Sequence, residues 1–177
     1  MERSQEHPIL DIIRFAILAL LIVVPIRIFI AQPFIVSGAS MEDTFHNNEY
    51  LIVDQLSYRF SEPDRGDVVI FRYPRDPSKF FIKRVIALPG DTISEGFILN
   101  EPYSEEMSPE TAIEMALQED EYFVMGDNRD ASSDSRVWGA LERKYIVGKA
   151  FLRLYPLTEV KLLPGQYPLP SKTKLTN

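Results

Sequence analysis

Hydrophobic residues form one long run near the start of the chain and several short runs after it. From Phe15 to Ile26 no residue is charged, and the apolar character extends outward to Ile9 and Ala31. At about 1.5 Å per helical residue, the segment from Ile9 to Ala31 would be about 34 Å long, enough to cross a hydrocarbon core of about 30 Å. The pattern therefore predicts one N-terminal transmembrane helix, and we assign residues 1–31 to a membrane anchor.

Two other interpretations of this apolar segment are less consistent with the sequence. A buried core helix would need apolar surroundings, and nothing else in the chain is hydrophobic enough to provide them. A cleaved secretory signal is disfavoured because Asp11 interrupts the basic region that should precede the apolar run, and because Phe29 with Ala31 is a poor small-x-small cleavage site. Two arginines before the segment against one at its end give only a small bias toward an N-terminus inside the cell.

After Ala31 the apolar residues occur in short runs that are separated by Gly, Pro, Asn and Asp. We predict strands at YLIVD (50–54), DVVIFR (67–72), FFIKRVIA (80–87), FIL (97–99), EYFVMGD (121–127) and YIVGKAFLRLY (145–155). This spacing is typical of a mainly β fold rather than of alternating βαβ units. We therefore expect a small antiparallel β-barrel or sandwich over residues 32–163.

One short helix and a tail interrupt this β pattern. Ser108 is expected as the N-cap and Pro109 as the first residue of a helix that continues to about Leu117. This short helical insert lies in an acidic stretch, which we interpret as a solvated surface excursion. The final stretch, residues 164–177, is rich in proline and polar residues and is predicted to be a disordered tail.

Composition excludes several classes of protein. The 177 residues allow one domain of ordinary size, and 19 basic against 26 acidic residues give a net charge of −7, which argues against a nucleic-acid binder. The chain has no cysteine, so thiol nucleophiles and Cys-ligated metals are excluded. His7 and His46 are the only histidines, so a His-rich metal site is not expected.

With cysteine absent and histidine scarce, lysine is the natural substitute for an activating base. In the run FFIKRVIA, the two-residue period of a strand places Phe81, Lys83 and Val85 on one face. A lysine with such neighbours either reaches solvent at a sheet edge or is desolvated, and desolvation lowers the lysine pKa toward values useful to a general base. The strand pattern alone leaves both interpretations open.

Two further segments carry candidate chemistry. In SGASMEDTF (37–45), Gly38 and Ala39 allow a carbonyl group to approach both the hydroxyl and the backbone N–H of Ser40. In GDNRDASSDSRVWG (126–139), charged residues alternate with Asn, Ser and Gly. This second segment could be an exposed loop with weak surface ion pairs, but its position between an apolar strand and Trp138 favours a loop that folds back and is internally hydrogen-bonded.

Together these segments resemble the type I signal peptidases, which are membrane-anchored Ser/Lys endopeptidases that remove signal peptides from exported proteins. The resemblance covers nearly the whole chain, in order: the N-terminal span, SGASMEDTF, RGDVVIFRYP, FIKRVIALPGD and GDNRDASSDSRVWG. It implies that Ser40 is the nucleophile, Lys83 the general base, and Ser132 the hydroxyl that orients the lysine amine. It also implies that the site is supported, through hydrogen bonds and ion pairs, by Asp127, Arg129, Asp134 and Arg136.

The resemblance also implies a substrate and a location. The expected substrate is a preprotein signal peptide with small side chains at the first and third positions before the cut, and the implied acyl transfer needs no metal and no cofactor. The expected location is the plasma membrane, with a single span in the lipid bilayer and the catalytic domain on the extracytoplasmic side. Three residues depart from the family pattern near the nucleophile: Asp43 replaces a proline, Phe45 replaces a leucine, and Gly38 stands where some members have a serine that is a second oxyanion donor.

Three rival functions fit the sequence less well. A repressor-type Ser/Lys autoprotease would need a DNA-reading domain and no membrane span. A non-enzymatic, membrane-anchored β-domain would not need the set Ser40, Lys83 and Ser132. A serine hydrolase based on His46 is disfavoured because this histidine lies in a turn-like stretch only six residues from Ser40.

Overall fold

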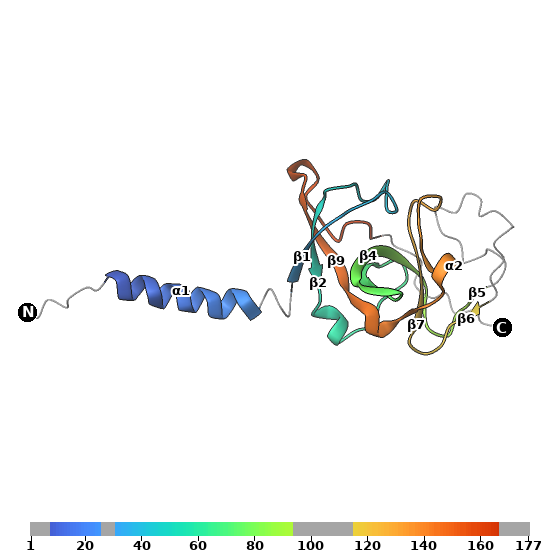
Figure 1. Cartoon of the computed structure of the whole chain (residues 1–177), viewed down its shortest axis with the longest axis horizontal. Helices are drawn as coiled ribbons and strands as arrows, with labels where there is room; N and C mark the ends of the chain where they lie inside the picture. Colours follow the sequence, from blue (N-terminus) through green and yellow to red (C-terminus); the bar gives the residue numbers. More distant parts are fainter. Residues whose placement is uncertain (1–7, 26–30, 94–114, 167–177) are drawn as a thin grey trace, which may run out of the picture.

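The computed structural model describes residues 8–25, 31–93 and 115–166 of the chain. It begins with a long helix, followed by a body built mainly of β-strands (Figure 1). The helices are α1 (Pro8–Pro25), α2 (Ser135–Trp138) and three short 3-10 turns, η2 (Ser57–Arg59), η4 (Arg143–Tyr145) and η5 (Leu157–Glu159). The strands are β1 (Ala31–Ile35), β2 (Tyr50–Asp54), β3 (Val68–Tyr73), β4 (Asp76–Ala87), β5 (Thr92–Ile93), β6 (Met115–Ala116), β7 (Glu121–Met125), β8 (Leu141–Glu142), β9 (Ile146–Tyr155) and β10 (Lys161–Leu162).

Eight of these strands form one antiparallel sheet. The order is β1-β2-β9-β3-β4-β7-β8, with β10 paired to β9, while β5 and β6 form a separate pair. The mainly β, antiparallel character is therefore confirmed. Among the described strands the hydrogen-bonded path runs open from β1 to β8, so a closed barrel is not confirmed.

The short apolar runs correspond closely to observed strands. The run at 50–54 is β2, and the runs at 67–72, 80–87, 121–127 and 145–155 contain most of β3, β4, β7 and β9. The run at 97–99 lies outside the described residues. Strand β1 was not predicted, and antiparallel pairing with β2 forms it.

The predicted helix from Ser108 to Leu117 lies mostly outside the described residues, but its C-terminal end is wrong. Met115 and Ala116 form β6, which pairs with β5. Leu117 and Ile93 are buried in the same apolar cluster. Burial of these side chains against the sheet therefore outweighs the local preference for helix at this end.

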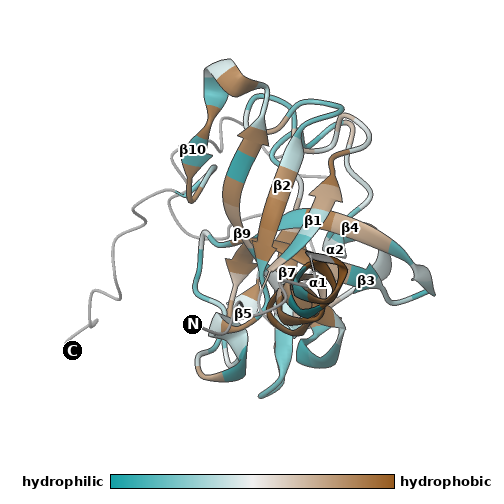
Figure 2. Cartoon of the chain, turned by 90° about the vertical axis from the view of Figure 1, so that its left-hand side faces the viewer, coloured by the Kyte–Doolittle hydropathy of each residue, from teal (hydrophilic) through white to brown (hydrophobic). Residues whose placement is uncertain are grey.

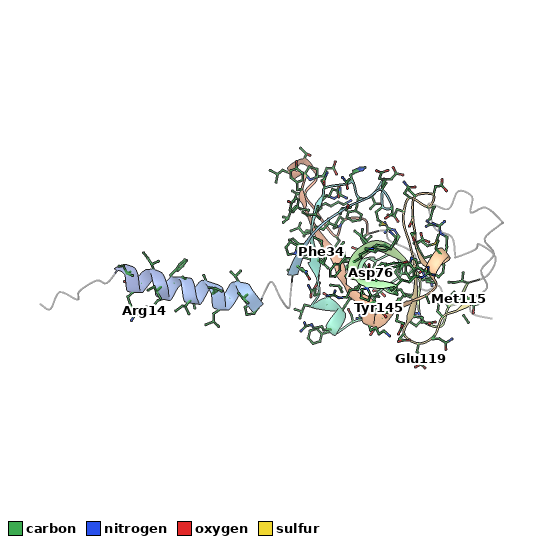
Figure 3. All side chains as sticks on the ribbon, viewed as in Figure 1. Arg14, Phe34, Asp76, Met115, Glu119 and Tyr145 are labelled. Atoms are coloured by element: carbon green, nitrogen blue, oxygen red, sulfur yellow. The ribbon has the colours of Figure 1, made fainter. Side chains whose placement is uncertain are left out.

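Helix α1 is strongly apolar and has exposed side chains. Figure 2 shows it mostly in the hydrophobic colour, and Figure 3 shows its side chains projecting around it. Phe15 and Leu21 are among the apolar residues that are exposed there. In the part of the chain that the structure describes, no helix is long and apolar enough to cross a membrane, so the predicted transmembrane helix is not confirmed.

The core of the body consists of three apolar clusters that lie against the main sheet. One cluster contains Met41 and Phe45, which are fully buried next to Val53 and Val68 of the sheet. Because these two residues flank the Ser40 turn on its C-terminal side, core packing fixes the backbone that carries this serine.

The folded body extends past the predicted boundary at residue 163. Pro164 is buried, and the carbonyl of Gly165 accepts a hydrogen bond from the Arg84 guanidinium. Residues 164–166 therefore belong to the folded part, whereas 167–177 lie outside the described residues.

Candidate active site

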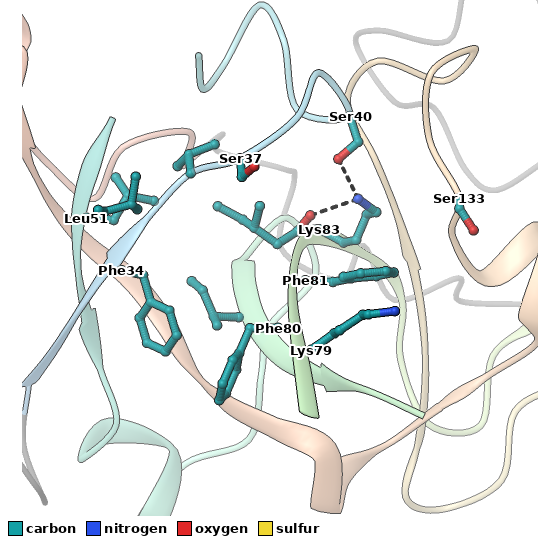
Figure 4. Close-up of a pocket in the computed structure, with 13 residues that line it drawn as sticks. Phe34, Ser37, Ser40, Leu51, Lys79, Phe80, Phe81, Lys83 and Ser133 are labelled. Carbon is teal, nitrogen blue, oxygen red and sulfur yellow. Dashed lines mark hydrogen bonds between the residues drawn. The ribbon is translucent and has the colours of Figure 1, made fainter. Parts of the chain in front are cut away.

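Ser40 and Lys83 come from different parts of the chain and meet in the structure. Ser40 lies in the turn between β1 and β2, and Lys83 lies in β4. The Nζ atom of Lys83 is 2.6 Å from Oγ of Ser40 and donates a second hydrogen bond, of 3.0 Å, to the carbonyl of Ile82 (Figure 4). This places an amine within proton-transfer distance of a hydroxyl.

Lys83 is buried rather than at a solvated edge. Its residue is only 3% exposed, and its amine lies 5.6 Å from the centre of the Phe81 ring. Burial lowers the lysine pKa from 10.5 to about 8, while the Asp134 and Asp127 carboxylates act in the opposite direction. A far larger fraction of this amine is therefore neutral near physiological pH than is the case for an ordinary lysine.

The Ser40 turn has an unusual backbone. Gly38 has φ of 95°, and its N–H donates to Oδ1 of Asn47 over 3.1 Å. Asp43 has φ of 77°, which a proline cannot adopt because its ring fixes φ near −65°. A proline at position 43, which the family pattern led us to expect, would therefore require a different backbone here. Within the described residues the Ser40 N–H donates no hydrogen bond, so it is available to an incoming oxygen.

The loop that follows β7 docks directly on the backbone of Ser40. The Asn128 N–H donates to the Ser40 carbonyl over 3.1 Å. A Cβ atom on Gly126 would lie 2.3 Å from that same carbonyl oxygen and 2.3 Å from Oγ of Ser132. Only glycine fits at this contact, so the GDN segment is folded onto the body and is not an exposed loop.

A buried ion pair joins this loop to β4. Arg84 donates from Nε to Oδ1 of Asp127 over 2.7 Å and from Nη2 to Oδ2 over 2.5 Å. The Thr44 hydroxyl donates to Oδ2 of Asp127 over 2.6 Å. Arg84 is next to Lys83 in the sequence, and Thr44 is four residues after Ser40. The Asp127 carboxylate therefore connects the segments that carry the two reactive groups.

A second network fixes the end of the same loop. The buried Asp134 carboxylate accepts from the Gly126 N–H and from the Arg136 guanidinium, and Asp134 also caps α2. Although burial raises the pKa of this carboxyl group, the hydrogen bonds from Arg136 and Gly126 bring it below its ordinary value. Arg136 donates to the carbonyl of Arg129, whose own Nε donates to the carbonyl of Gly126.

Ser132 lies beside this network without contacting Lys83 through a hydrogen bond. Its Oγ atom is buried and has no hydrogen bond of good geometry, although it contributes to the lowered pKa of Asp134. Its place against Gly126 puts it next to the backbone of Ser40. The neighbouring Ser133, by contrast, is exposed and lines the pocket described next.

Ser40 and Lys83 lie in the wall of a pocket of about 430 Å³. Figure 4 shows that β1 and β4 provide most of its walls. Its lining is mainly apolar and consists of Phe34, Ile35, Val36, Ser37, Ser40, Leu51, Ile70, Lys79, Phe80, Phe81, Ile82, Lys83 and Ser133. An extended peptide could thus reach the serine hydroxyl along a hydrophobic groove.

His46 is not brought into this site. It is exposed and does not line the pocket that contains Ser40. Over the described residues, no group of three or more His, Asp or Glu side chains is arranged to hold a metal ion.

Three residues that hold the site together were not predicted from the sequence. These are Thr44, Arg84 and Arg153, the last of which donates to the carbonyl of Thr44. A signal for Arg84 was present, since an arginine beside Lys83 in an otherwise apolar strand needs a buried anion, and Asp127 is a candidate. No local signal identifies Arg153, because its contact with Thr44 joins residues far apart in the chain.

Comparisons with known proteins identify the family of this chain. The family described as "Signal peptidase, peptidase S26" matches residues 9–155. A probable signal peptidase I-2 of Synechocystis sp. is 34% identical over 176 residues, which cover 92% of this chain and 80% of the relative. Signal peptidase I P of Bacillus subtilis subsp. natto is 33% identical over 179 residues, which cover 90% of this chain and 96% of the relative. A solved structure of signal peptidase I from Enterococcus faecalis V583 is 26% identical and covers 50% of this chain and 97% of its own, with a TM-score of 0.41.

A family match over most of the chain and relatives of more than 30% identity lead to the same conclusion. This chain belongs to the signal peptidase family, peptidase S26.

Proposed function

We propose that this protein is a membrane-bound serine endopeptidase that removes N-terminal signal peptides from exported preproteins, with Ser40 as nucleophile and Lys83 as general base. The observation that carries the proposal is the 2.6 Å separation of Lys83 Nζ and Ser40 Oγ in the wall of an apolar pocket. Signal peptidase relatives across most of the chain support the substrate class.

The reaction is an acyl transfer in two halves. Neutral Lys83 accepts the Ser40 proton while Oγ attacks the scissile carbonyl carbon, and the Ser40 N–H stabilises the resulting oxyanion. Collapse of this intermediate breaks the C–N bond, and the Lys83 ammonium gives its proton to the departing amine of the mature protein. Lys83 then deprotonates a water that attacks the acyl ester, which releases the signal peptide and restores Ser40.

The remaining residues act on the position and charge of this pair. We propose that Ser132 orients the Lys83 amine, and its buried Oγ, which lies beside the Ser40 backbone and has no hydrogen bond of good geometry, supports that role. Asp127, Asp134, Arg129 and Arg136 hold the loop that docks on Ser40, so their role is structural support.

The anchor and its orientation belong to the same proposal. We propose that the apolar segment up to Ala31 holds the protein in the plasma membrane by a single span, with the catalytic body outside. Exposed apolar side chains along α1 support this assignment. In cells that express the protein, it should remain in the membrane fraction after alkaline carbonate washing, and added protease should digest the body of intact spheroplasts. Extraction by carbonate would contradict the anchor, and protection from protease would contradict the orientation.

The catalytic assignment is tested by cleavage of a preprotein with detergent-solubilised enzyme. We expect Ser40→Ala and Lys83→Ala each to lower kcat/KM by at least about 10³-fold, since each removes a group that reacts. His46→Ala should cleave like the unmodified protein, because His46 is outside the pocket. If activity survives Lys83→Ala and is lost in His46→Ala, the Ser/Lys assignment is wrong. If the unmodified protein cleaves no preprotein, it is a non-enzymatic β-domain.

Gly126→Ala should impair cleavage without removing any reactive group. The added Cβ would lie 2.3 Å from the Ser40 carbonyl oxygen, so the loop or the Ser40 turn must move. A displacement of about 1 Å is expected to lower kcat by about 10²-fold. The matched control is Ala131→Ser, an exposed position in the same loop, which should cleave normally. Normal kcat in Gly126→Ala would show that the close contact does not position the nucleophile.

A further inference from the structure

Lys79 lies in the wall of the same pocket as Ser40 but has no role in the reaction described above. Its side chain is 65% exposed, and its amine is 3.1 Å from the Asp76 carboxylate. Figure 4 shows the side chain extended beside the Phe81 ring, at the pocket. A positive charge at the rim of an otherwise apolar groove is a feature that a bound peptide would meet.

The strands around the pocket have free edges that suit an extended peptide. Strand β1 is the last strand of the sheet path, so one of its edges is unpaired among the described strands. Strand β4 pairs with β3 along one edge, while β7 covers its other edge only from Arg84 to Ala87. The stretch from Lys79 to Ile82 therefore has an edge that the described strands leave open to a peptide strand.

Spacing along β4 indicates which residue of a paired peptide would meet Lys79. Lys79, Phe81 and Lys83 share one face of β4, because side chains alternate along a strand. Four residues at about 3.3 Å each separate Lys79 from Lys83 by about 13 Å. In a peptide that pairs with the open edge of β4, with its first residue before the cut beside Lys83 and its earlier residues running toward Lys79, the fifth side chain lies on the face of Lys79 at this distance.

We infer that Lys79 is a specificity-determining residue that pairs with an acidic side chain at the fifth position before the cleaved bond. This inference rests on the proposed function, which places the segment before the cut in the pocket. The ion pair with Asp76 does not prevent Lys79 from pairing with the peptide instead. Its carboxylate also accepts from the Ser78 hydroxyl over 2.6 Å and from the Ser78 N–H over 3.3 Å, so it keeps these bonds when Lys79 turns to the peptide.

The test uses the full chain in detergent and quenched peptides with Ala at the first and third positions and Glu, Gln or Lys at the fifth. For the unmodified protein we expect kcat/KM to be about two- to fivefold higher for the Glu peptide than for the Lys peptide, as is usual for an exposed ion pair. In Lys79→Glu the ratio of kcat/KM between the Glu and Lys peptides should invert. In 0.5 M salt the Debye length is about 4 Å, so the ratio of either protein should approach one.

Two controls make the outcome specific. Lys144→Glu reverses the charge of another exposed lysine, which also has a carboxylate partner but does not line the pocket. This variant should keep the preference for the Glu peptide. Moving Glu to the sixth position, on the opposite face, should abolish the preference. A Lys79→Glu variant that retains the ratio of the unmodified protein would overturn the inference.

Binding separates this inference from the proposed function. The Kd values of the Ser40→Ala variant for the same peptides, measured by fluorescence anisotropy, should show the same preference for Glu. If no peptide is cleaved but binding still depends on the charge at residue 79, the proposed function fails and only the selection of acidic peptides by Lys79 stands. If Kd does not differ between the Glu and Lys peptides, the inference fails whatever the result for cleavage.

Discussion

Lys83→Met should abolish cleavage and at the same time make the protein more stable at neutral pH. Loss of the amine removes the base, so kcat/KM should fall by at least about 10³-fold. The thioether chain fills a similar volume without a charge, in a place where the ammonium is 3% exposed and desolvated. The lowering of the lysine pKa from 10.5 to about 8 corresponds to about 3 kcal/mol of unfavourable free energy that the folded protein carries when Lys83 is protonated.

The pH dependence of this stability difference has a definite sign. Below pH 8 the lysine is protonated in both states, and the folded state carries the full desolvation cost. Between pH 8 and 10.5 the unfolded chain binds the proton and the folded protein does not, so stability rises with pH. The stabilisation by Lys83→Met, measured by urea denaturation, should therefore be largest below pH 8 and disappear above 10.5.

A second lysine provides the control for stability. Lys149 is partly buried and its amine is 2.5 Å from the Asp67 carboxylate. Lys149→Met should destabilise the protein, because it leaves a buried carboxylate without its cation. A Lys83→Met variant that is also destabilised below pH 8 would show that the Lys83 ammonium is well solvated or well paired, which would contradict our account of the base.

The same amine should set the pH profile of cleavage. Only neutral Lys83 can accept the Ser40 proton, so kcat/KM should rise with pH and reach half of its plateau near pH 8. A midpoint well below pH 8 would contradict Lys83 as the base.

Asp127→Ala should have the largest effect on stability among the supporting residues. The Arg84 and Asp127 side chains are 3% and 9% exposed, and removal of the carboxylate takes away the buried ion pair and the hydrogen bonds that Asp127 makes with Arg84. Breaking a buried pair from one side costs about 3–5 kcal/mol. The midpoint of urea denaturation should fall accordingly, and kcat should fall as well because Thr44 loses its acceptor.

An exposed ion pair provides the comparison. Lys144 and Glu142 are in contact at the surface, and Glu142→Gln should change stability by less than about 1 kcal/mol. If Asp127→Ala costs no more than Glu142→Gln, the buried pair does not hold the site together. If Asp127→Ala is destabilised but retains full kcat, the hydrogen bond between Thr44 and Asp127 is not needed to position Ser40.

Some features of this protein follow from local sequence alone. The β-branched and aromatic runs determined most of β2, β3, β4, β7 and β9, because alternating or continuous apolar stretches between turn residues have few other stable solutions. The motifs around Ser40, Lys83 and residues 126–139 are sufficient by themselves to identify the candidate site. The absence of cysteine and the scarcity of histidine limited the base to lysine.

Other features required contacts between distant residues. Strand β1 and the short strands β5 and β6 exist because of their pairing partners, and no local pattern specifies those partners. The strand pattern of Lys83 was compatible with both a solvated and a buried amine. The tertiary structure buries the Lys83 amine beside Phe81, which decides between these two environments. This burial lowers the pKa of Lys83.

The sequence by itself thus determined the residue types of the site and the strands that carry them. Only the tertiary structure decided that Lys83 lies 2.6 Å from Ser40, that Asp127 joins Arg84 to Thr44, and that Gly126 is packed against the Ser40 carbonyl. The physical reason is that spacing along a chain fixes which face a side chain takes, whereas desolvation and proton transfer depend on distances between segments that are far apart in sequence.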